Sequence, residues 1–207
     1  MIGASRALLV KKYSLHINCG GSKTTIGNTT YESDEVLGGA TKFYWTNNKY
    51  WGFSSTGGFW DHNRTNDDYM AKNLTVLSMD NSELYMTARL SPLSLTYYGR
   101  CLANGSYTVK LHFAEIIFRD DKNFSSLGRR IFDVYIQENL VLKDFNIENV
   151  SGGVDKEVIR EFRAVVRDKT LEIRFQWVGK GTTCVPSRGN YGPLISAISM
   201  KSGKLFV

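Results

Sequence analysis

Apolar and polar residues alternate with a period of two along most of the chain, and this pattern predicts β-strands rather than helices. In one segment, Tyr107, Val109, Leu111 and Phe113 alternate with polar residues. Because successive side chains of a strand point to opposite faces, such a segment has one buried and one solvent-facing side. The alternation predicts strands at 15–18, on both sides of Asn47-Asn48 within 43–53, and at 84–90, 95–98, 107–113, 131–136, 140–145, 158–166, 171–177 and 194–200.

Turn signals separate these strands. Residues 137–139 and 167–170 each lie between two predicted strands and indicate hairpins. Strands recur roughly every 8 to 15 residues, a spacing typical of a β-sandwich or jelly roll, and at most one helical turn is expected within 67–79. We therefore predict an all-β jelly-roll sandwich in one domain over 14–200, with an N-terminal extension at 1–13 and a C-terminal tail at 201–207.

The composition is that of a folded chain with a basic surface. Of 207 residues, 42% are hydrophobic and 22% charged, and the formal net charge is +6. Disorder is therefore not expected, and no run approaches the ~20 apolar residues that span a bilayer. Lys110, His112 and Arg174 lie at solvent-facing strand positions rather than in a dense basic cluster, so no nucleic-acid partner is expected. Attraction to an anionic polysaccharide stays open and would weaken steeply with salt.

Asn-x-Ser/Thr sequons are more frequent than chance predicts for this composition. A glycan is bulky and needs a surface loop in the secretory pathway, and most of these sequons lie where turns are expected. The excess predicts an extracellular chain or a plasma-membrane ectodomain. The six candidate glycosylation sites are Asn28, Asn63, Asn73, Asn104, Asn123 and Asn149.

The three cysteines allow one disulfide and leave one thiol over. Cys19 closes the first predicted strand and Cys184 precedes the last one, and first and last strands are often neighbours in antiparallel sandwiches. We therefore hypothesise a bridge between Cys19 and Cys184, with Cys101 left over. The cysteines match no zinc pattern and the histidines are scattered, so we expect neither a metal nor a cofactor.

Catalytic motifs are absent from the sequence. It contains no Gly-x-Ser-x-Gly elbow, no phosphate-binding loop and no kinase signature. A glycosidase needs two carboxylates across a cleft, and Glu115, Asp133 and Asp144 are the candidates. These carboxylates are better explained as strand-edge or turn residues. We therefore expect no enzyme activity in this chain.

Aromatic residues near turns are the best candidates for binding. Sugar rings have apolar faces that stack on aromatic side chains, while their hydroxyls need amides and Tyr hydroxyls nearby. Tyr31, Tyr97, Tyr98 and Tyr191, with Asn190, form the candidate carbohydrate-binding set. Packing in the core or in turns is the alternative for each tyrosine. For the aromatic cluster at 45–51, core packing is favoured, because large aromatic side chains usually fill cores.

Several segments resemble a malectin domain, in the version found in plant leucine-rich-repeat receptor-like serine/threonine kinases. The resemblance covers about 14–200 and is carried by the segments 17–21, 31–34, 104–116, 128–136, 141–147 and 191–198. It implies a jelly-roll sandwich of the galactose-binding-like kind, which in animal malectin binds a glucose-capped glycan through loop aromatics and an aspartate. Tyr31 matches the first of those aromatics, and Tyr97 and Tyr98 lie near another.

The segment that resembles the aspartate region has no Asp, because it consists of Asn190-Tyr191-Gly192. The animal sugar specificity is therefore not expected here. In the plant receptors this module lies outside the cell, between the repeats and a membrane helix that precedes a kinase. The expected function is thus a non-catalytic extracellular module that binds an oligosaccharide or cell-wall glycan. The alternative is a protein-interaction or spacer module, with a receptor or peptide partner and a vestigial sugar site.

Overall fold

The computed structural model describes residues 10–59, 69–73, 79–118, 128–183 and 191–203, and these residues form an all-β molecule with short helical turns. The strands are β1 (Ser14–Cys19), β2 (Thr24–Ile26), β3 (Thr29–Asp34), β4 (Thr41–Trp45), β5 (Trp51–Thr56), β6 (Met70–Lys72), β7 (Thr87–Leu90), β8 (Ser94–Gly99), β9 (Gly105–Ala114), β10 (Arg130–Ile136), β11 (Asn139–Phe145), β12 (Glu157–Val166), β13 (Leu171–Gly181), β14 (Leu194–Ile195) and β15 (Ala197–Ser202). The helical turns are the 3-10 turn η2 (Ser82–Leu84) and the helix α1 (Ile147–Ser151).

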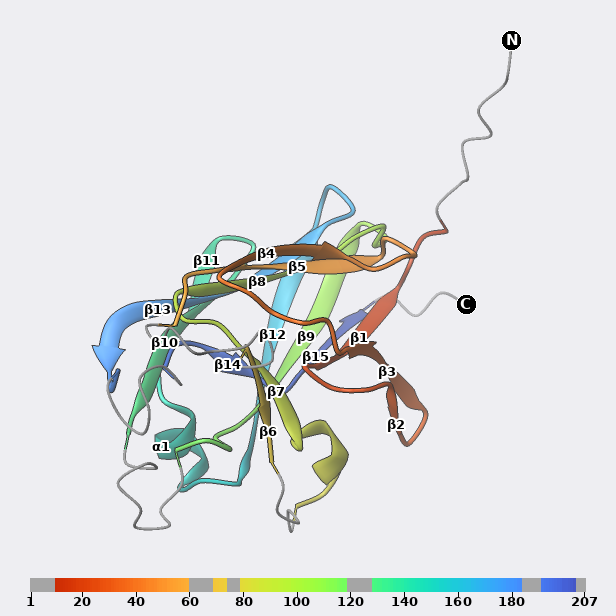
Figure 1. Ribbon diagram of the computed structural model, residues 1–207. Helices are drawn as coiled ribbons and strands as arrows, with labels where there is room; N and C mark the ends of the chain where they lie inside the picture. Colours follow the sequence, from red (N-terminus) through yellow and green to blue (C-terminus); the bar gives the residue numbers. More distant parts are fainter. Residues whose placement is uncertain (1–9, 60–68, 74–78, 119–127, 184–190, 204–207) are drawn as a thin grey trace.

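Two six-stranded sheets form the layers of a sandwich (Figure 1). The first sheet has the order β12-β9-β15-β1-β3-β2, and the second has the order β11-β10-β13-β8-β5-β4. A small third sheet, β14-β7-β6, lies beside them. The first and last strands, β1 and β15, are antiparallel neighbours as predicted, while β1 and β3 run parallel. The predicted all-β sandwich is confirmed.

The core lies between the two sheets and consists of the apolar side of each alternating strand. Phe113 of β9 packs against Phe132 of β10 and Phe175 of β13, with ring centroids 6.1 and 6.2 Å apart. All three are fully buried. Burying one such side chain stabilises the fold by roughly 1.5–3 kcal/mol. The two-residue period, which directs these side chains inward, therefore explains most of the packing between the two sheets.

The hairpin predicted around residues 137–139 is present as β10–β11, but the one predicted around 167–170 is wrong. β12 pairs with β9 in the first sheet, whereas β13 pairs with β10 and β8 in the second, so residues 167–170 connect the two layers. In the β10–β11 hairpin, Gln137 and Glu138 adopt positive φ angles of 50° and 66°, and Asn139 already begins the next strand. Two consecutive left-handed residues make a type I′ turn, whose twist matches that of the flanking strands. The Gln137 side chain then ties this turn to the connection between β12 and β13, because its amide donates to the Thr170 carbonyl at 3.0 Å.

Three local expectations need correction. His112 is only 7% exposed rather than solvent-facing, because η2 and β7 cover that side of the first sheet and Tyr85 contacts its ring. Helix α1 was not expected; it is a single short helix, capped where the Asn146 side chain accepts the Asn149 amide at 2.9 Å. Within 67–79 the strand β6 was not expected, although Tyr69 directly before it has the 3-10 geometry of the expected helical turn.

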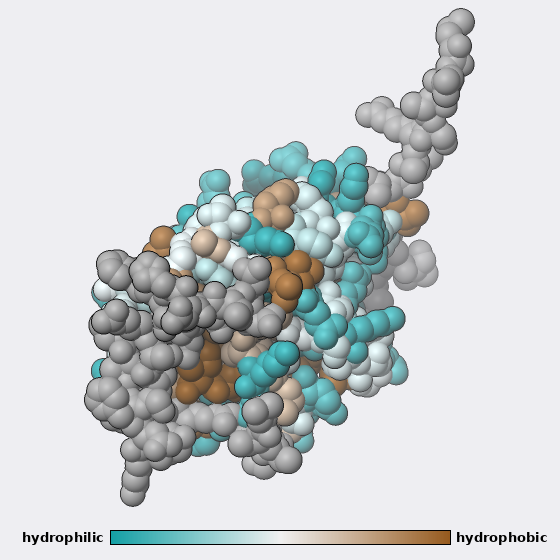
Figure 2. Space-filling model, viewed as in Figure 1, coloured by the Kyte–Doolittle hydropathy of each residue, from teal (hydrophilic) through white to brown (hydrophobic). Residues whose placement is uncertain are grey.

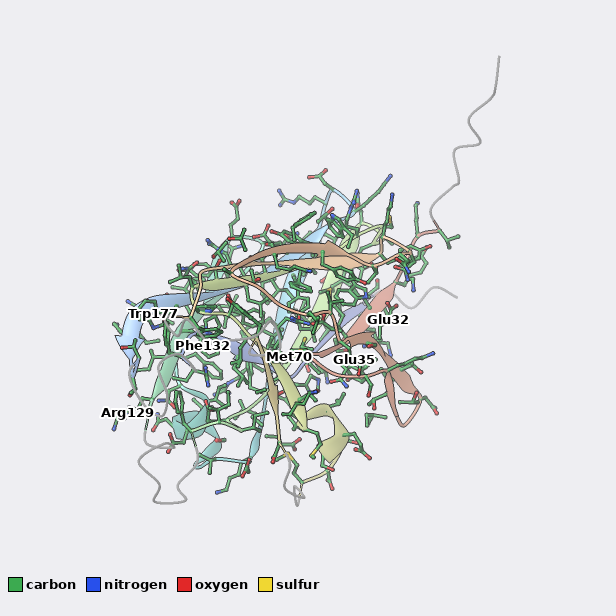
Figure 3. The ribbon with its side chains drawn as sticks, viewed as in Figure 1. Glu32, Glu35, Met70, Arg129, Phe132 and Trp177 are labelled. Carbon is green, nitrogen blue, oxygen red and sulfur yellow. The ribbon has the colours of Figure 1, made fainter. Side chains whose placement is uncertain are left out.

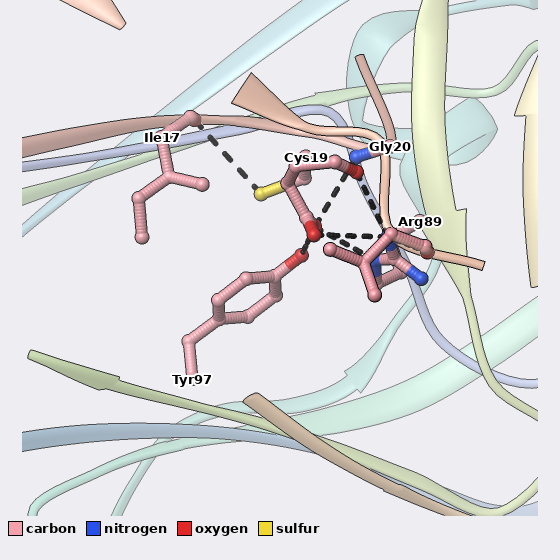
Figure 4. Close-up of polar contacts among 7 residues, drawn as sticks. Ile17, Cys19, Gly20, Arg89 and Tyr97 are labelled. Atoms are coloured by element: carbon pink, nitrogen blue, oxygen red, sulfur yellow. Dashed lines mark hydrogen bonds and ion pairs between the residues drawn. The ribbon is translucent and has the colours of Figure 1, made fainter. Parts of the chain in front are cut away.

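A buried ion pair joins β3, β7 and β8 (Figure 4). Arg89 donates to Asp34 through Nε at 2.7 Å and through Nη2 at 2.9 Å, and the Gly20 amide donates to the same carboxylate at 3.3 Å. Burial raises the pKa of Asp34, whereas Arg89, Tyr97 and the Gly20 amide oppose that shift. The charge is therefore compensated inside the core, which makes the pair sensitive to the loss of either partner.

Candidate functional site

Tyr97, one of the expected sugar-binding residues, lies in the core. Its side chain is fully buried and its hydroxyl donates to Oδ2 of Asp34 at 2.5 Å (Figure 4). Burial raises the pKa of Tyr97, so the phenol is neutral at physiological pH. The structure therefore corrects the binding role expected for this ring, because neither of its faces is open to a ligand.

Tyr31 is also covered, on the outer side of the first sheet. Its ring lies 5.5 Å from His16 and 6.2 Å from His112, both in edge-on contacts, and it is 6% exposed. The hydroxyl of Tyr85 lies 3.0 Å from Nδ1 of His112 and continues this cluster. Tyr31 thus packs between the first sheet and the segment of η2 and β7 that covers it. The structure therefore corrects its expected role as an open ring on which a sugar could stack.

Tyr191 lies far from Tyr31. It is 7% exposed and packs against Phe59 at 5.8 Å and Trp177 at 5.3 Å. Figure 3 shows Trp177 on the opposite side of the molecule from Glu32, the neighbour of Tyr31 in β3. The expected tyrosines therefore do not form a single rim, and Asn190 lies outside the described residues.

Tyr98 is different, because it is half exposed on the outer side of the second sheet. Trp45 lies beside it with ring centroids 5.9 Å apart, and Phe43 packs edge-on against Trp45 at 5.4 Å. Phe43 is 61% exposed. The guanidinium of Arg100 lies 4.8 Å above the Trp45 ring. These side chains form a partly exposed aromatic group on β4, on β8 and on the residue that follows β8.

The strand register explains how this group lies against the sheet. Trp45 pairs with Gly52, and Gly52 pairs with Tyr98. A Cβ added at Gly52 would meet Cε3 of Trp45 at 2.4 Å, so the indole occupies the space that any larger residue would fill. The absence of a side chain at position 52 therefore lets a large aromatic ring lie against the sheet beside Tyr98.

Hydroxyl side chains separate the aromatic group from a second stacked pair. Along one row of the register, Phe43 is followed by Ser54, Thr96, Arg174 and Tyr135 on successive strands. Four strand spacings make this row about 19 Å long. The Arg174 guanidinium lies 4.5 Å above the Tyr135 ring. The hydroxyl of Ser54 lies 3.0 Å from that of Tyr98.

We call this surface the aromatic face and define it by Phe43, Trp45, Tyr98, Arg100, Tyr135 and Arg174, with Ser54 and Thr96 between them. Near β4 and β5, Figure 2 shows white and teal residues together with some tan and brown ones. Flat rings surrounded by hydroxyls and guanidinium groups suit a ligand that has apolar faces and many hydroxyls.

The sequence predicted only part of the aromatic face. Tyr98 was expected to bind, whereas Trp45 was assigned to core packing with the rest of 45–51 and Phe43 was not singled out. In that cluster only Trp51 is a core residue, fully buried with its Nε1 donating to Glu32 at 2.7 Å. The two-residue period places Phe43 and Trp45 on the same side of β4, opposite Tyr44, and this signal was available before the structure.

The candidate carboxylates have structural partners. Glu115 is 1% exposed and accepts from Nε of Arg130 at 2.8 Å. Asp133 accepts the Asp144 amide at 2.7 Å, and Asp144 pairs with Lys180 at 2.7 Å. As expected for strand-edge and turn residues, these carboxylates hold backbone and ion-pair partners and do not form a catalytic pair.

The sequons divide by exposure. Asn28, Asn104 and Asn149 are exposed on turns and on α1 and can carry glycans. The glycosylation expected at Asn73 is corrected, because this residue is only 4% exposed and its side-chain amide donates to Asp155 at 3.3 Å. A glycan on that nitrogen would not fit inside the fold. The sequons at Asn63 and Asn123 lie outside the described residues.

Cys19 is a free, fully buried thiol whose Sγ lies 3.9 Å from the Ile17 carbonyl. Burial raises its pKa, so the thiol is protonated and unreactive. The structure therefore does not support the expected bridge to Cys184, a residue that lies outside the described ranges. Among the described residues, no cluster of His, Cys, Asp and Glu could hold a metal, and no helix has the length and hydropathy of a membrane span.

Comparison with known families supplies a second line of evidence. The family model described as the malectin domain matches residues 13–198. A probable LRR receptor-like serine/threonine-protein kinase of Arabidopsis thaliana, At1g07650, is 50% identical over 91% of this chain, and RFK1 of the same plant is 48% identical over 91%. Each match covers 19% of the relative, so the chain spans about a fifth of the length of these proteins.

Solved structures share the fold at low sequence identity. The plant receptor-like kinase FER matches 91% of this chain and 42% of its own, with a TM-score of 0.59 and 21% identity. The ANX1 ectodomain of Arabidopsis thaliana matches 92% of this chain and 48% of its own, with a TM-score of 0.57 and 14% identity. A Bacteroides uniformis β-glucuronidase matches 92% of this chain and 18% of its own, with a TM-score of 0.60 and 14% identity.

Proposed function

The chain belongs to the malectin domain family, and from this premise we propose that it binds a carbohydrate of the cell surface through its aromatic face. The domain is a non-catalytic module of the kind found in receptor ectodomains, and the kinase activity of its relatives lies in the remainder of those longer proteins. The open question is therefore which surface of this module recognises a ligand and what that ligand is.

One observation carries the proposal: Phe43 is exposed, and Trp45 and Tyr98 are partly exposed beside it on the outer side of the second sheet, whereas the other expected tyrosines are buried. Exposed aromatic groups cost free energy in water, so a contiguous group of them indicates a binding surface. A pyranose can stack its apolar face on the indole and the phenol. Its hydroxyls then meet the side chains of Ser54, Arg100 and Arg174.

The distribution of sequons supports this assignment. The strands of the second sheet contain no sequon asparagine, while the exposed Asn28, Asn104 and Asn149 lie on turns and on α1. Glycans at those three positions would extend from the edges of the domain. The aromatic face would then stay accessible on an otherwise glycosylated extracellular module.

The test is titration of the domain by isothermal calorimetry against a panel of cell-wall oligosaccharides. We expect Trp45→Ala and Tyr98→Ala each to lower affinity at least about tenfold, which is ~1.4 kcal/mol. Ile159→Ala is the matched control, because Ile159 is an exposed apolar residue of the first sheet, 46% accessible. Unchanged affinity in both face variants would exclude this surface, and no binding by the parent domain would exclude carbohydrate recognition.

The second candidate function is a protein-interaction or spacer module. The burial of Tyr31, Tyr97 and Tyr191 favours it, because three of the four tyrosines expected to bind sugar act in packing. In that case the calorimetric panel shows no binding, while the domain still contributes to the assembly of its parent receptor.

A further inference from the structure

Strand β12 is a long, regular edge strand of the first sheet, and among the described residues no strand pairs with its outer edge (Figure 1). It pairs with β9 in an unbroken register over its ten residues, so it contains no bulge. The other edge strands of the two large sheets are short or irregular, because β2 and β4 have three and five residues and β11 pairs with β10 in a shifted register. A long and regular strand edge is a template for pairing with a further strand.

Hydrogen-bond directions show which backbone groups of β12 face the free edge. The His112 carbonyl of β9 accepts the Ser196 amide, so the even-numbered residues of β9 face β15 and the odd-numbered ones face β12. Each odd-numbered residue of β9 pairs with an even-numbered residue of β12. The N–H and C=O groups of the odd-numbered residues of β12 therefore face outward. In agreement, the Val165 carbonyl accepts Nε2 of Gln137 at 3.4 Å from the side opposite β9.

The side chains of these odd-numbered residues alternate in a self-complementary order. All are exposed, and with the residue that follows the strand they are Glu157, Ile159, Glu161, Arg163, Val165 and Arg167. The order is acidic, apolar, acidic, basic, apolar and basic. In the reverse direction each acidic residue is replaced by a basic one and each apolar residue by another apolar one. The row is therefore complementary to a second copy of itself that runs antiparallel.

We propose that the free edge of β12 binds the same edge of a second copy of this chain, so that the two first sheets join through an antiparallel pair of β12 strands. A two-fold axis at Phe162 sets the register. The hydrogen-bonded pairs across this axis, each present twice, are Glu157 with Arg167, Ile159 with Val165, and Glu161 with Arg163. The pairs within the strand alone supply about eight backbone hydrogen bonds. This surface is separate from the aromatic face, so the inference does not rest on carbohydrate binding.

Charge distinguishes this register from its nearest alternatives. An axis at Glu161 places the two copies of that carboxylate opposite each other and Ile159 opposite Arg163. An axis at Arg163 places two guanidinium groups opposite each other and Glu161 opposite Val165. Like charges directly opposite each other are destabilising, whereas opposite charges and apolar pairs stabilise a sheet. The axis at Phe162 is therefore favoured over both alternatives.

The charged side chains of the row can accept new partners. Within the described part of the chain, no ion pair involves Arg163 or Arg167. Glu161 contacts Lys110 at 3.1 Å in a largely exposed pair, and a carboxylate can accept from two cations. The guanidinium of Arg163 in the second copy can therefore pair with Glu161 without displacing Lys110.

The structure also has room for the added strand. A recess of about 780 Å³ lies beside the C-terminal half of β12, with Arg163 and Val165 on one side and the β10–β11 hairpin on the other. A neighbouring strand needs about 4.8 Å of separation. The Gln137 side chain would yield the Val165 carbonyl to the Ile159 amide of the second copy and would keep its bond to Thr170.

The inner side of the edge is compatible with the same register. Phe162 is partly buried against the core, and at the axis it meets its own copy in a pair without backbone hydrogen bonds, where side chains lie closest. Val158 lies opposite Val166, and Arg160 lies opposite Ala164. Apolar contacts thus continue across the axis, and no like charges meet on this side.

The first experiment is sedimentation equilibrium of the domain over a wide range of concentrations. We expect a reversible dimer with a Kd on the order of 10–100 µM, because a single added strand gives a small interface. In the dimer, the Ile159, Glu161 and Arg163 amides should gain protection from hydrogen exchange. The Arg160 and Phe162 amides face β9 and should not change. A domain that stays monomeric at concentrations well above that range overturns the proposal, as does a dimer without this protection.

A charge exchange then tests the register. Glu161→Arg and Arg163→Glu each place like charges opposite each other twice, so each should weaken self-association at least about tenfold. An equimolar mixture of the two variants should form a heterodimer about as tight as the parent dimer, because each charge then meets its opposite. This recovery also shows that both variants are folded.

Lys23→Glu is the matched control, because Lys23 is exposed near the opposite edge of the first sheet and the charge change equals that of Arg163→Glu. This variant should dimerise like the parent. Self-association that neither edge variant weakens, or a mixture that stays monomeric, would overturn the proposed pairing.

Discussion

At the scale of single residues, burial decides the role of each aromatic and titratable side chain. His112 illustrates this, because its position in the alternation predicts exposure and yet it is buried beside Tyr31 and Tyr85. Nδ1 faces the Tyr85 hydroxyl, while Nε2 is buried without a hydrogen-bond partner among the described residues. Protonation of this ring would therefore place an uncompensated charge under the cover of η2 and β7.

The histidine predicts an acid-sensitive fold. Burial lowers the pKa of His112 from 6.5 to about 4, with Lys110 and His16 adding to the shift. Because the folded pKa is depressed, the stabilisation is complete above about pH 6.5 and is lost as the pH falls toward 4. In urea unfolding at pH 7 and pH 4.5, His112→Gln should lose less stability on acidification than the parent. An equal loss in both proteins would show that other groups, such as His16, carry the acid sensitivity.

At the scale of elements, the β4–β5 hairpin presents the aromatic face because one of its residues has no side chain. Trp45 lies against Gly52, and the neighbouring ring of Tyr98 completes the surface. The β10–β11 hairpin works differently, since its two left-handed turn residues set the register and its Gln137 side chain ties it to the connection between β12 and β13. In the β4–β5 hairpin a missing side chain positions Trp45, and in the β10–β11 hairpin two left-handed residues position Gln137, so in both cases local backbone geometry places a side chain outside the core.

Gly52→Ala tests the role of this glycine. A Cβ at position 52 meets the Tyr44 carbonyl at 2.2 Å and the Trp45 ring at 2.4 Å, so both the backbone of β4 and the indole must shift. We expect a loss of about 1–3 kcal/mol in the free energy of unfolding and a shift of the tryptophan fluorescence. Gly58→Ala is the control, because its Cβ meets only Cβ of Ala40 at an ordinary 3.7 Å. Stability unchanged in both variants would contradict this account.

At the scale of the whole molecule, the sandwich separates the exposed sequons from the aromatic face. The aromatic face lies on the outer side of the second sheet, whereas the exposed sequons lie on turns and on α1. Glycans at those positions would therefore leave the aromatic face accessible.

Glycosylation provides a whole-molecule prediction. When the domain is expressed through a eukaryotic secretory pathway, we expect glycopeptides at Asn28, Asn104 and Asn149 in mass spectrometry and none at Asn73. The reason is accessibility, since Asn73 is 4% exposed and bonded to Asp155. Replacing each of the three exposed asparagines by Gln should remove one glycan, whereas a glycan on Asn73 in folded protein would contradict the structure.

Much of the architecture was predictable from local pattern, because a two-residue period and turn chemistry act over a few residues. The strands around Phe113 and Phe132, the β10–β11 hairpin and the pairing of the first and last strands were expected and are present, whereas the strands expected to form a hairpin around 167–170 lie in different sheets. The candidate site was less predictable. Tyr97 and Tyr98 are adjacent and chemically alike, yet one ends in the core and the other at the surface.

The sequence by itself determined that this chain forms a β-sandwich of the malectin family, because strand period, turns and motifs are local properties that any reader of the chain can see. Only the tertiary structure decided which tyrosines are open, that Asn73 is closed to glycans and that 158–166 and 171–177 lie in different sheets. The physical reason is that exposure depends on what packs over a side chain. Those covering residues, such as η2 over the first sheet, come from distant parts of the sequence.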